Sequence, residues 1–314
     1  INRRIHIAYQ REWKKHFGST EFACVIHYNG YEAYTTSLLE EAPCPRSIWI
    51  HNDMAREVHL KGNMNPYLLK EAYHTYDHIV PVSEDLIQPV VSEFGADRSR
   101  ITAIHNCHDY QSVLERSLAP VAFNEDTLSL ETLQSVLDSD APKFISIGRF
   151  SPEKGHKRLL DAFEQYWKEH PDTWLIIIGG VGNLYDETLA HTRALRASDH
   201  IILIRAVTNP MPILKRCDLF LLSSYYEGQG IVLMEAATLG IPVMACDVSG
   251  CHSFLKKYGG LLLEDSEAGL LHGMQLFAEG KVLPLNIDAE RINHTSAAQV
   301  EALIAGDIHI SPQN

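Results

Sequence analysis

Two glutamates stand on either side of Gly-Gln-Gly in the stretch YYEGQGIVLMEAATLGIPV, residues 225–243. We expect a helix to begin near Gly230, because glycine permits the unusual backbone angles of a tight turn. At about 1.5 Å of rise per residue, Glu235 then lies about 7 Å further along the chain than the loop that holds Glu227. This offset fits poorly with two carboxylates that flank one scissile bond as acid and base. It favours two carboxylates that accept hydroxyl groups from opposite ends of one long polar ligand, with helix-start amides between them for a phosphate.

Glu235 also has a simpler interpretation, as an exposed glutamate on a helix. Its neighbours in IVLMEAATLG are apolar or small, however, and a carboxylate among them is costly unless it has a partner. The apolar run DLFLLSS precedes the loop, so Glu227 follows a predicted strand closely. We therefore favour a ligand-binding role for both glutamates.

Two cations stand in a second candidate motif, GRFSPEKG, residues 148–155, which follows an apolar strand-like run. Arg149 and Lys154 are five residues apart across a Ser-Pro turn, so both can face one anion at the end of the strand, where parallel sheets bind ligands. Backbone amides at the start of the next helix add a favourable dipole. Two solvated surface cations are the alternative interpretation.

The glycines of IIIGGVGN, residues 176–183, suggest a dinucleotide-binding turn, but the rest of that pattern is missing. Tyr185 stands where the fingerprint requires glycine, and the next strand ends in Arg205 instead of an acidic residue for a ribose. We interpret this segment as a plain strand–helix turn whose glycines let a ligand or a helix approach closely.

Two polar clusters could be mistaken for metal sites. The Asp-Ser-Asp of residues 138–140 precedes a strand, and we interpret it as a solvated turn. HTYDH, residues 74–78, has two histidines at helical spacing but lacks the glutamate and third ligand of a zinc protease site, so it is interpreted as a helix surface. His51 ends the run SIWIH, where either a functional or a hydrogen-bonded structural histidine fits.

Composition excludes several classes of protein. The chain has 314 residues, enough for two domains, and a net charge of −13 without a block of Lys or Arg, which argues against nucleic-acid binding. No apolar run reaches the roughly 18–20 residues of a membrane span, although the charge argues only weakly against peripheral membrane contact. The six cysteines lack a C-x-x-C pair, and nothing near Ile1 resembles a signal peptide. We expect a cytoplasmic protein with reduced thiols, with the inner face of the membrane as an alternative location.

Short apolar runs alternate with helix-period stretches along the chain, which predicts parallel α/β architecture. A polar, acidic segment with Pro120 and Pro142 marks the domain boundary. The predicted strands are 22–28, 47–51, 78–83 and 101–105 before this boundary, and 143–148, 173–179, 201–206, 218–224, 242–247 and 260–264 after it.

Four regions follow from this pattern. We expect an N-terminal Rossmann-like domain over 1–112, a linker over 113–142 and a second α/β domain over 143–285. The region 286–314 is expected to hold a helix that packs back toward the N-terminal domain. The N-terminal domain has few predicted strands and no Gly-rich strand–helix turn. Either this domain is unusually small or its first strands precede residue 1, and we expect it to be truncated.

Together these segments resemble the retaining glycosyltransferases of family 4, the group 1 glycosyltransferases. The resemblance is strong over residues 143–265 and weaker in WIHND (49–53), YDHIVPVSE (76–84) and IHNCHD (104–109), the last being similar to the usual Pro-Asn-Gly-x-Asp segment. It implies a GT-B fold, with two Rossmann-like domains whose parallel sheets face each other across a cleft. It also implies that 1–112 is the acceptor-side domain and that 143–285 is the domain that binds the nucleotide-sugar donor. The EGQG sequence and the Asn209-Pro210 pair also resemble the corresponding segments of relatives encoded near cell-wall and capsule polymer genes.

The resemblance also implies roles for individual residues. Arg149 and Lys154 would bind the diphosphate of a nucleotide-sugar, Glu227 the hydroxyls of the donor sugar and Glu235 those of the ribose. The implied catalytic residues are Arg149, Lys154, Glu227 and His51, and the implied donor-binding residues are Gly228, Gln229, Gly230, Ile231, Glu235, Val207 and Asn106. His51 would lie near the reacting sugar, and Val207 would line the base pocket.

On this resemblance the protein is a hexosyltransferase that needs no cofactor and no metal and retains the anomeric configuration. Its partners would be a nucleotide-sugar donor and a glycan, lipid-linked or polymer acceptor, in the synthesis of a cell-wall, capsule or other surface glycan. The family's N-terminal Gly-rich loop has no counterpart here. Two alternatives therefore stay open: a nucleotide-sugar epimerase or phosphorylase with the GT-B fold, and a non-catalytic partner subunit.

Overall fold

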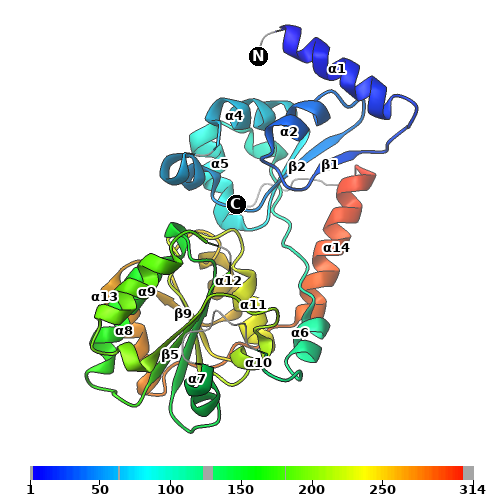
Figure 1. Cartoon of the computed structure of the whole chain (residues 1–314). Helices are drawn as coiled ribbons and strands as arrows, with labels where there is room; N and C mark the ends of the chain where they lie inside the picture. The colour runs from blue at the N-terminus through cyan, green and yellow to red at the C-terminus, as the bar shows by residue number, and fades with distance from the viewer. Residues whose placement is uncertain (1–2, 63, 123–129, 181, 307–314) are drawn as a thin grey trace. The chain divides into compact units, whose positions relative to one another are not determined.

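The computed structural model describes residues 3–306 apart from 63, 123–129 and 181. The chain divides into two compact units (Figure 1): residues 1–107 together with 291–314, and residues 108–290. The segment predicted as a linker, 113–142, lies within the second unit and contains most of one helix and all of another. It is polar because its helices are largely exposed, while Leu133 and Val136 are buried.

The described residues of the first unit contain a three-stranded parallel sheet. Its strands are β1 (Val25–His27), β2 (Arg46–Ile50) and β3 (His78–Pro81), in the order β1-β2-β3. Its helical elements are α1 (Arg3–Phe17), α2 (Ala33–Leu39), α3 (Met54–Arg56), η1 (Glu57–Lys61), α4 (Pro66–Thr75), η2 (Glu84–Leu86), α5 (Ile87–Phe94) and η3 (Arg98–Arg100).

The predicted fourth strand of this unit, 101–105, is wrong. One isolated bridge, Ile79 to Ile101, forms there, with backbone bonds from the Thr102 amide to the Ile79 carbonyl and from the Ile104 amide to the Pro81 carbonyl. Ile101 and Ile104 are both buried. The apolar residues of this segment therefore reflect burial beside β3, and the segment does not form a fourth strand of the sheet.

The core of the first unit lies around β2 and β3. Ile48, Ile50 and Ile79 are buried there together with Leu69 and Tyr73 of α4. The C-terminal helix α14 (Ala289–Ala305) belongs to this unit from residue 291 onward, and its Leu303 lies in the same core.

In the second unit the described residues form a six-stranded parallel sheet. All six strands predicted after residue 142 are confirmed, each slightly shorter than its apolar run. They are β4 (Lys143–Ile147), β5 (Trp174–Ile178), β6 (Ile201–Ile204), β7 (Leu219–Leu222), β8 (Val243–Cys246) and β9 (Leu261–Leu263). The order is β6-β5-β4-β7-β8-β9, so the direction of winding reverses between β4 and β7. The carboxyl end of a sheet at such a reversal is where doubly wound folds bind ligands.

Helices cover both faces of this sheet. In Figure 1, α8 (His156–Trp167), α9 (Tyr185–Ala194) and α13 (Glu267–Ala278) lie on one side, while α10 (Met211–Leu214) and α11 (Ile231–Thr238) lie on the other. The other helical elements are α6 (Tyr110–Arg116), α7 (Leu130–Leu137), η4 (Pro152–Lys154), η5 (Ser198–His200) and α12 (His252–Tyr258). The apolar face of α8 is buried through Leu159, Leu160, Phe163 and Tyr166.

Two further observations concern the chain as a whole. All six cysteines lie among the described residues, and none forms a disulfide. Within those residues, no helix combines the length and the apolar character needed to cross a membrane.

Candidate functional site

The candidate site lies at the reversal of the second unit's sheet. Lys154 ends the short helix η4 after β4, and Glu227 lies in the loop after β7. The Lys154 Nζ donates to Glu227 Oε1 at 2.7 Å, and only 17% and 11% of the two side chains are exposed. The Ser224 hydroxyl donates to the same carboxylate oxygen at 2.5 Å. Two motifs 73 residues apart in the sequence therefore meet at one point.

Glycines allow the two loops to approach this closely. Gly155 has a φ of +62°, and a Cβ there would lie 2.3 Å from the Ser223 carbonyl oxygen. On the other side of the Glu227 loop, Gly250 has a φ of +79°, and its Cβ would lie 2.6 Å from the Glu227 carbonyl oxygen. The Glu227 amide also donates to the Ser249 carbonyl at 3.0 Å. The Glu227 loop is thus held between two turns that leave no room for a side chain.

Arg149 does not join the same ion pair. Its Nη2 donates to Glu153 Oε1 at 3.0 Å, and 59% of its side chain is exposed. The buried Glu153 is a site residue that sequence reasoning missed. No spacing rule marked this pair, because Arg149 lies outside the short helix η4 that holds Glu153.

The helix predicted to begin near Gly230 does so, because α11 starts at Ile231 with Gly230 as its N-cap at a φ of +64°. Gly230 has no side chain with which to cap this end, and the dipole of the first turn favours an anion there. Gly228 and Gln229 are buried, and the Gln229 amide lies 3.6 Å from the Met234 sulfur. Ile231 is largely exposed.

Glu235 is the fifth residue of α11 and is partly buried. Burial raises the pKa of this carboxyl, and the positive charge of Arg116 opposes the rise. Its carboxylate makes no hydrogen bond to any residue that the structure describes. It is therefore an acceptor held in a partly desolvated position.

A histidine that sequence reasoning did not single out fixes the end of α11. The His108 Nε2 shares a 2.8 Å hydrogen bond with the hydroxyl of Thr238, one turn beyond Glu235. His108 is buried, and burial lowers its pKa. The neutral ring thus connects the start of the second unit to the helix that carries Glu235.

In the first unit, Tyr28 joins two of the predicted residues. The His51 Nε2 donates to the Tyr28 carbonyl at 2.8 Å, and the Tyr28 hydroxyl donates to Asn106 Oδ1 at 3.0 Å. The His51 and Tyr28 rings meet edge to face at 4.6 Å, and burial lowers the pKa of His51. His51 therefore makes the structural hydrogen bond that was considered for it. Its role near the reacting sugar stays a prediction. No sequence motif marked Tyr28 as the link.

The remaining candidates lie as follows. Val207 is partly buried in the loop after β6. Asp138, of the acidic turn 138–140, accepts from Arg216 Nη1 at 3.1 Å. Among the described residues, no group of three His, Cys, Asp or Glu side chains is arranged to hold a metal ion. The prediction that 74–78 forms one helix surface is wrong, because α4 ends at Thr75 and His78 begins β3.

The glycines of 176–183 make room for a neighbouring aromatic ring. A Cβ on Gly179 would lie 1.9 Å from the ring of Phe150, and one on Gly182 would lie 2.3 Å from the Phe150 carbonyl oxygen. The close approach that was expected from a ligand or a helix comes from the turn after β4.

Comparison with known proteins agrees with this geometry. Residues 131–283 match the family model for "Glycosyl transferases group 1". These residues belong to the group 1 glycosyltransferases. Among curated relatives of this group 1 domain, the Campylobacter jejuni N-acetylgalactosamine-N,N'-diacetylbacillosaminyl-diphospho-undecaprenol 4-alpha-N-acetylgalactosaminyltransferase is 24% identical over 249 residues, or 78% of this chain and 61% of the relative. The Escherichia coli serotype-specific mannosyltransferase WbdA is 33% identical over 113 residues, or 34% of this chain and 14% of the relative.

Solved structures of low sequence identity share the architecture. The sucrose-phosphate synthase of Thermosynechococcus elongatus superposes with a TM-score of 0.72 at 16% identity, over 94% of this chain and 75% of that one. Anabaena HepE in complex with UDP and glucose gives 0.67 at 16% identity, over 86% and 74% of the two chains. The fold of the chain is therefore GT-B, with a Rossmann-like parallel sheet in each unit. The chain spans 61%, 47% and 32% of the length of the first three curated relatives.

Proposed function

We propose that this protein is a hexosyltransferase that transfers a sugar from a nucleotide-diphosphate-sugar to an acceptor. The observation that carries the proposal is the Lys154–Glu227 contact of 2.7 Å at the point where the winding of the sheet reverses. A cation and a carboxylate that lie side by side there can bind two different parts of one ligand. Lys154 suits its diphosphate, and Glu227 suits the hydroxyls of its sugar.

The surroundings of this pair support an extended donor. The uncapped start of α11 lies directly after the Glu227 loop and can receive phosphate oxygens on its amides. Glu235, further along the same helix, is an acceptor without a hydrogen-bond partner among the described residues and suits the two ribose hydroxyls. Val207 and Asn106 stay as proposed contacts to the base and to the donor.

We further propose that the departing diphosphate is stabilised by protein charge and that no metal ion is required. Lys154 and the helix dipole supply positive charge where the leaving group becomes negative, which lowers the barrier without reorganisation of the site. Retention of the anomeric configuration is proposed with it. The test is chelation: EDTA should leave both nucleotide binding and transfer unchanged, and a loss that Mg²⁺ or Mn²⁺ restores would refute this proposal.

A surface glycan is the proposed product, and a lipid-linked or polymeric glycan is the proposed acceptor. The support comes from the names of the relatives, which include an N-acetylgalactosaminyltransferase named for a diphospho-undecaprenol-linked sugar, a Vi polysaccharide biosynthesis protein of Salmonella typhi and a serotype-specific mannosyltransferase. UDP is the first nucleotide to test, since HepE was solved with UDP and glucose.

The decisive experiment is thermal unfolding with UDP, GDP, ADP, CDP and their sugars. One nucleotide should raise the melting temperature, and Lys154→Ala or Glu235→Ala should each remove the rise. Lys168→Ala, at an exposed lysine directly after α8 that contacts Gln165, is the matched control and should retain it. If no nucleotide stabilises the wild-type protein, the proposal is wrong. Products formed from a donor without any acceptor would instead favour an epimerase.

A further inference from the structure

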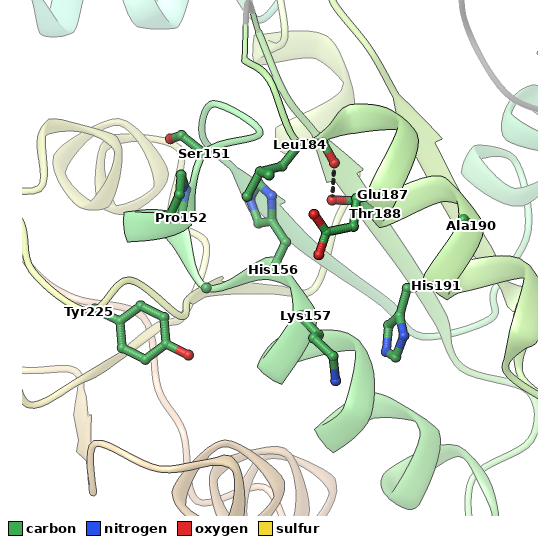
Figure 2. Close-up of a pocket in the computed structure, with 11 residues that line it drawn as sticks. Ser151, Pro152, His156, Lys157, Leu184, Glu187, Thr188, Ala190, His191 and Tyr225 are labelled. Carbon is green, nitrogen blue, oxygen red and sulfur yellow. Dashed lines mark hydrogen bonds between the residues drawn. The ribbon is translucent and has the colours of Figure 1, made fainter. Parts of the chain in front are cut away.

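A cavity of about 370 Å³ opens between the start of α8 and the side of α9 in the second unit (Figure 2). This volume lies within the range of roughly 300–1,000 Å³ that is usual for small-molecule sites. Its walls include His156, Glu187 and Tyr225, while Lys154, Glu227 and the other predicted donor residues are not among its lining. The cavity is therefore separate from the candidate donor site.

His156 is the buried polar group of this cavity. Its side chain is only 5% exposed and packs edge to face on the ring of Phe150 at 5.1 Å. Figure 2 shows the imidazole between the Ser151–Pro152 turn and Leu184. Neither ring nitrogen has a hydrogen-bond partner within the part of the chain that the structure describes. A buried polar group of this kind is costly unless something in the cavity completes its hydrogen bonds.

The protonation state of His156 limits what that partner can be. Burial, assisted by the charge of Lys154, lowers the pKa of the ring to about 4. The ring is therefore neutral near pH 7, with one nitrogen as a donor and the other as an acceptor. A ligand group that can both accept and donate, such as a hydroxyl, matches it.

The charges around the cavity disfavour an anion. The Glu187 carboxylate points toward the middle of the lining side chains in Figure 2 and makes no ion pair or hydrogen bond with described residues. Lys157 is already engaged, because its Nζ donates to Asp161 at 2.7 Å. The other Asp161 oxygen lies 2.6 Å from the His191 Nε2, which leaves no surplus positive charge for a phosphate.

Apolar surface completes the lining. Pro152 and Leu184 border the cavity, and Tyr225 adds an aromatic ring with a hydroxyl. The Arg158 guanidinium lies 3.9 Å from the centroid of that ring and holds it in place. Carboxylate, neutral imidazole and phenol groups beside apolar surface suit a molecule that has hydroxyls on its edge and C–H groups on its face.

We propose that this cavity binds a neutral pyranose sugar. Sugar hydroxyls donate to Glu187 and complete the hydrogen bonds of His156, and the C–H face of the ring packs against Pro152, Leu184 and Tyr225. The site goes beyond the proposed donor site, because it holds a sugar that is not being transferred. A unit of a glycan chain and a free monosaccharide share this chemistry.

The test is saturation-transfer NMR on the full chain with methyl α-D-glucopyranoside, methyl N-acetyl-β-D-glucosaminide, maltotriose and inorganic phosphate. We expect at least one sugar to bind and phosphate not to bind. Glu187→Ala should weaken binding at least tenfold. Asp186→Ala removes an exposed carboxylate from the same turn of α9, outside the cavity, and should leave binding unchanged. His156→Gln should weaken binding as well, and thermal melting shows which variants are folded.

Further outcomes separate this inference from the proposed function. Sugar binding should survive Lys154→Ala, which disables the donor site. If Lys154→Ala abolishes sugar binding and Glu187→Ala retains it, the sugar occupies the donor site and the cavity inference is wrong, although the proposed function stands. Binding of phosphate without sugars, or equal effects of Asp186→Ala and Glu187→Ala, would also overturn it. Tighter binding of maltotriose than of the monosaccharides assigns the cavity to a glycan chain, and equal binding assigns it to a single sugar.

Discussion

At the residue scale, the two glutamates of residues 225–243 differ in how their charge is supported. Glu227 accepts from Lys154 and Ser224, so its carboxylate is already stabilised by a cation and a hydroxyl. Glu235 has a raised pKa because burial penalises its charged form. A carboxylate whose charged form is penalised by burial lowers the stability of the fold, so we expect Glu235 to serve ligand binding more than stability.

We predict that Glu235→Gln stabilises the protein while it weakens nucleotide binding. Because the folded-state pKa is raised, the folded chain holds a proton that the unfolded chain releases. The free energy of unfolding therefore falls as pH rises from the ordinary glutamate pKa through the raised one, and the cost is complete above both. At pH 7.5 the variant should melt roughly 2 °C higher. Below the ordinary glutamate pKa, the difference in melting temperature should disappear.

The same variant should lose nucleoside diphosphate affinity at pH 7.5, as measured by calorimetry, because an amide is a poorer acceptor for two hydroxyls than a carboxylate. Wild-type affinity should also fall as pH drops through the raised pKa of Glu235. Glu169→Gln, an exposed glutamate after α8, should change neither stability nor binding. Equal affinity of Glu235→Gln and wild type would contradict the ribose role.

At the element scale, the site depends on how turns and helix ends are held. Gly155 lets the turn after β4 reach the Ser223 backbone, and the Ser223 hydroxyl in turn donates to the Lys154 carbonyl at 2.9 Å. The end of α11 is held by His108 through Thr238. These contacts set where Lys154 and Glu235 lie, although neither Gly155 nor Thr238 is among the residues proposed to touch the ligand.

We predict that Gly155→Ala destabilises the protein by about 1–3 kcal/mol, because the residue is left-handed and its Cβ would meet the Ser223 carbonyl oxygen at 2.3 Å. Urea denaturation measures the loss. Gly180→Ala is the matched control, since nothing lies within 4 Å of its added Cβ and its φ is not positive. A Gly155→Ala variant as stable as Gly180→Ala would show that the turn can relax.

We predict that Thr238→Val lowers stability by about 1 kcal/mol, because the buried His108 loses the hydroxyl that it contacts at 2.8 Å. Nucleotide affinity should fall a few-fold because α11 is held less firmly. Thr295→Val on α14, where the hydroxyl donates to the Arg291 carbonyl of its own helix and to no other described residue, should alter neither quantity. If Thr238→Val leaves the stability unchanged, the hydrogen bond to His108 does not hold the end of α11.

At the scale of the whole molecule, the proposed roles are divided between the two units. The residues proposed to contact the diphosphate, the sugar and the ribose all lie within 108–290, whereas His51 belongs to the first unit with Tyr28 and Asn106. Binding of the nucleotide and reaction of the sugar should therefore respond to different substitutions.

We predict that His51→Ala leaves the affinity for nucleoside diphosphate within about threefold and lowers the transfer rate on the order of 100-fold, the usual cost of losing one group that stabilises a transition state. His59→Ala, an exposed histidine 3.4 Å from Glu93, is the control and should keep full activity. If His51→Ala abolishes nucleotide binding instead, the residue supports the fold of the donor site and not the reacting sugar.

The sequence by itself determined the six strands of the second unit and the start of α11. Buried parallel strands are continuous apolar runs, and Gly230 marks a left-handed turn, so both signals are local. It also indicated the group 1 family, because the two motifs that carry it are short and contiguous. The prediction of a strand over 101–105 is wrong because an apolar run indicates burial, whereas a strand also needs continuous backbone pairing with a neighbouring strand.

Only the tertiary structure decided which distant residues meet. Lys154 pairs with Glu227 across 73 residues, whereas Arg149 turns to the nearby Glu153, and no spacing rule distinguishes the two cations. His51 and Asn106 come together through Tyr28, and His156 lies at a cavity formed by α8 and α9. Such contacts depend on which strands become neighbours, and strand order is set by the packing of the whole unit.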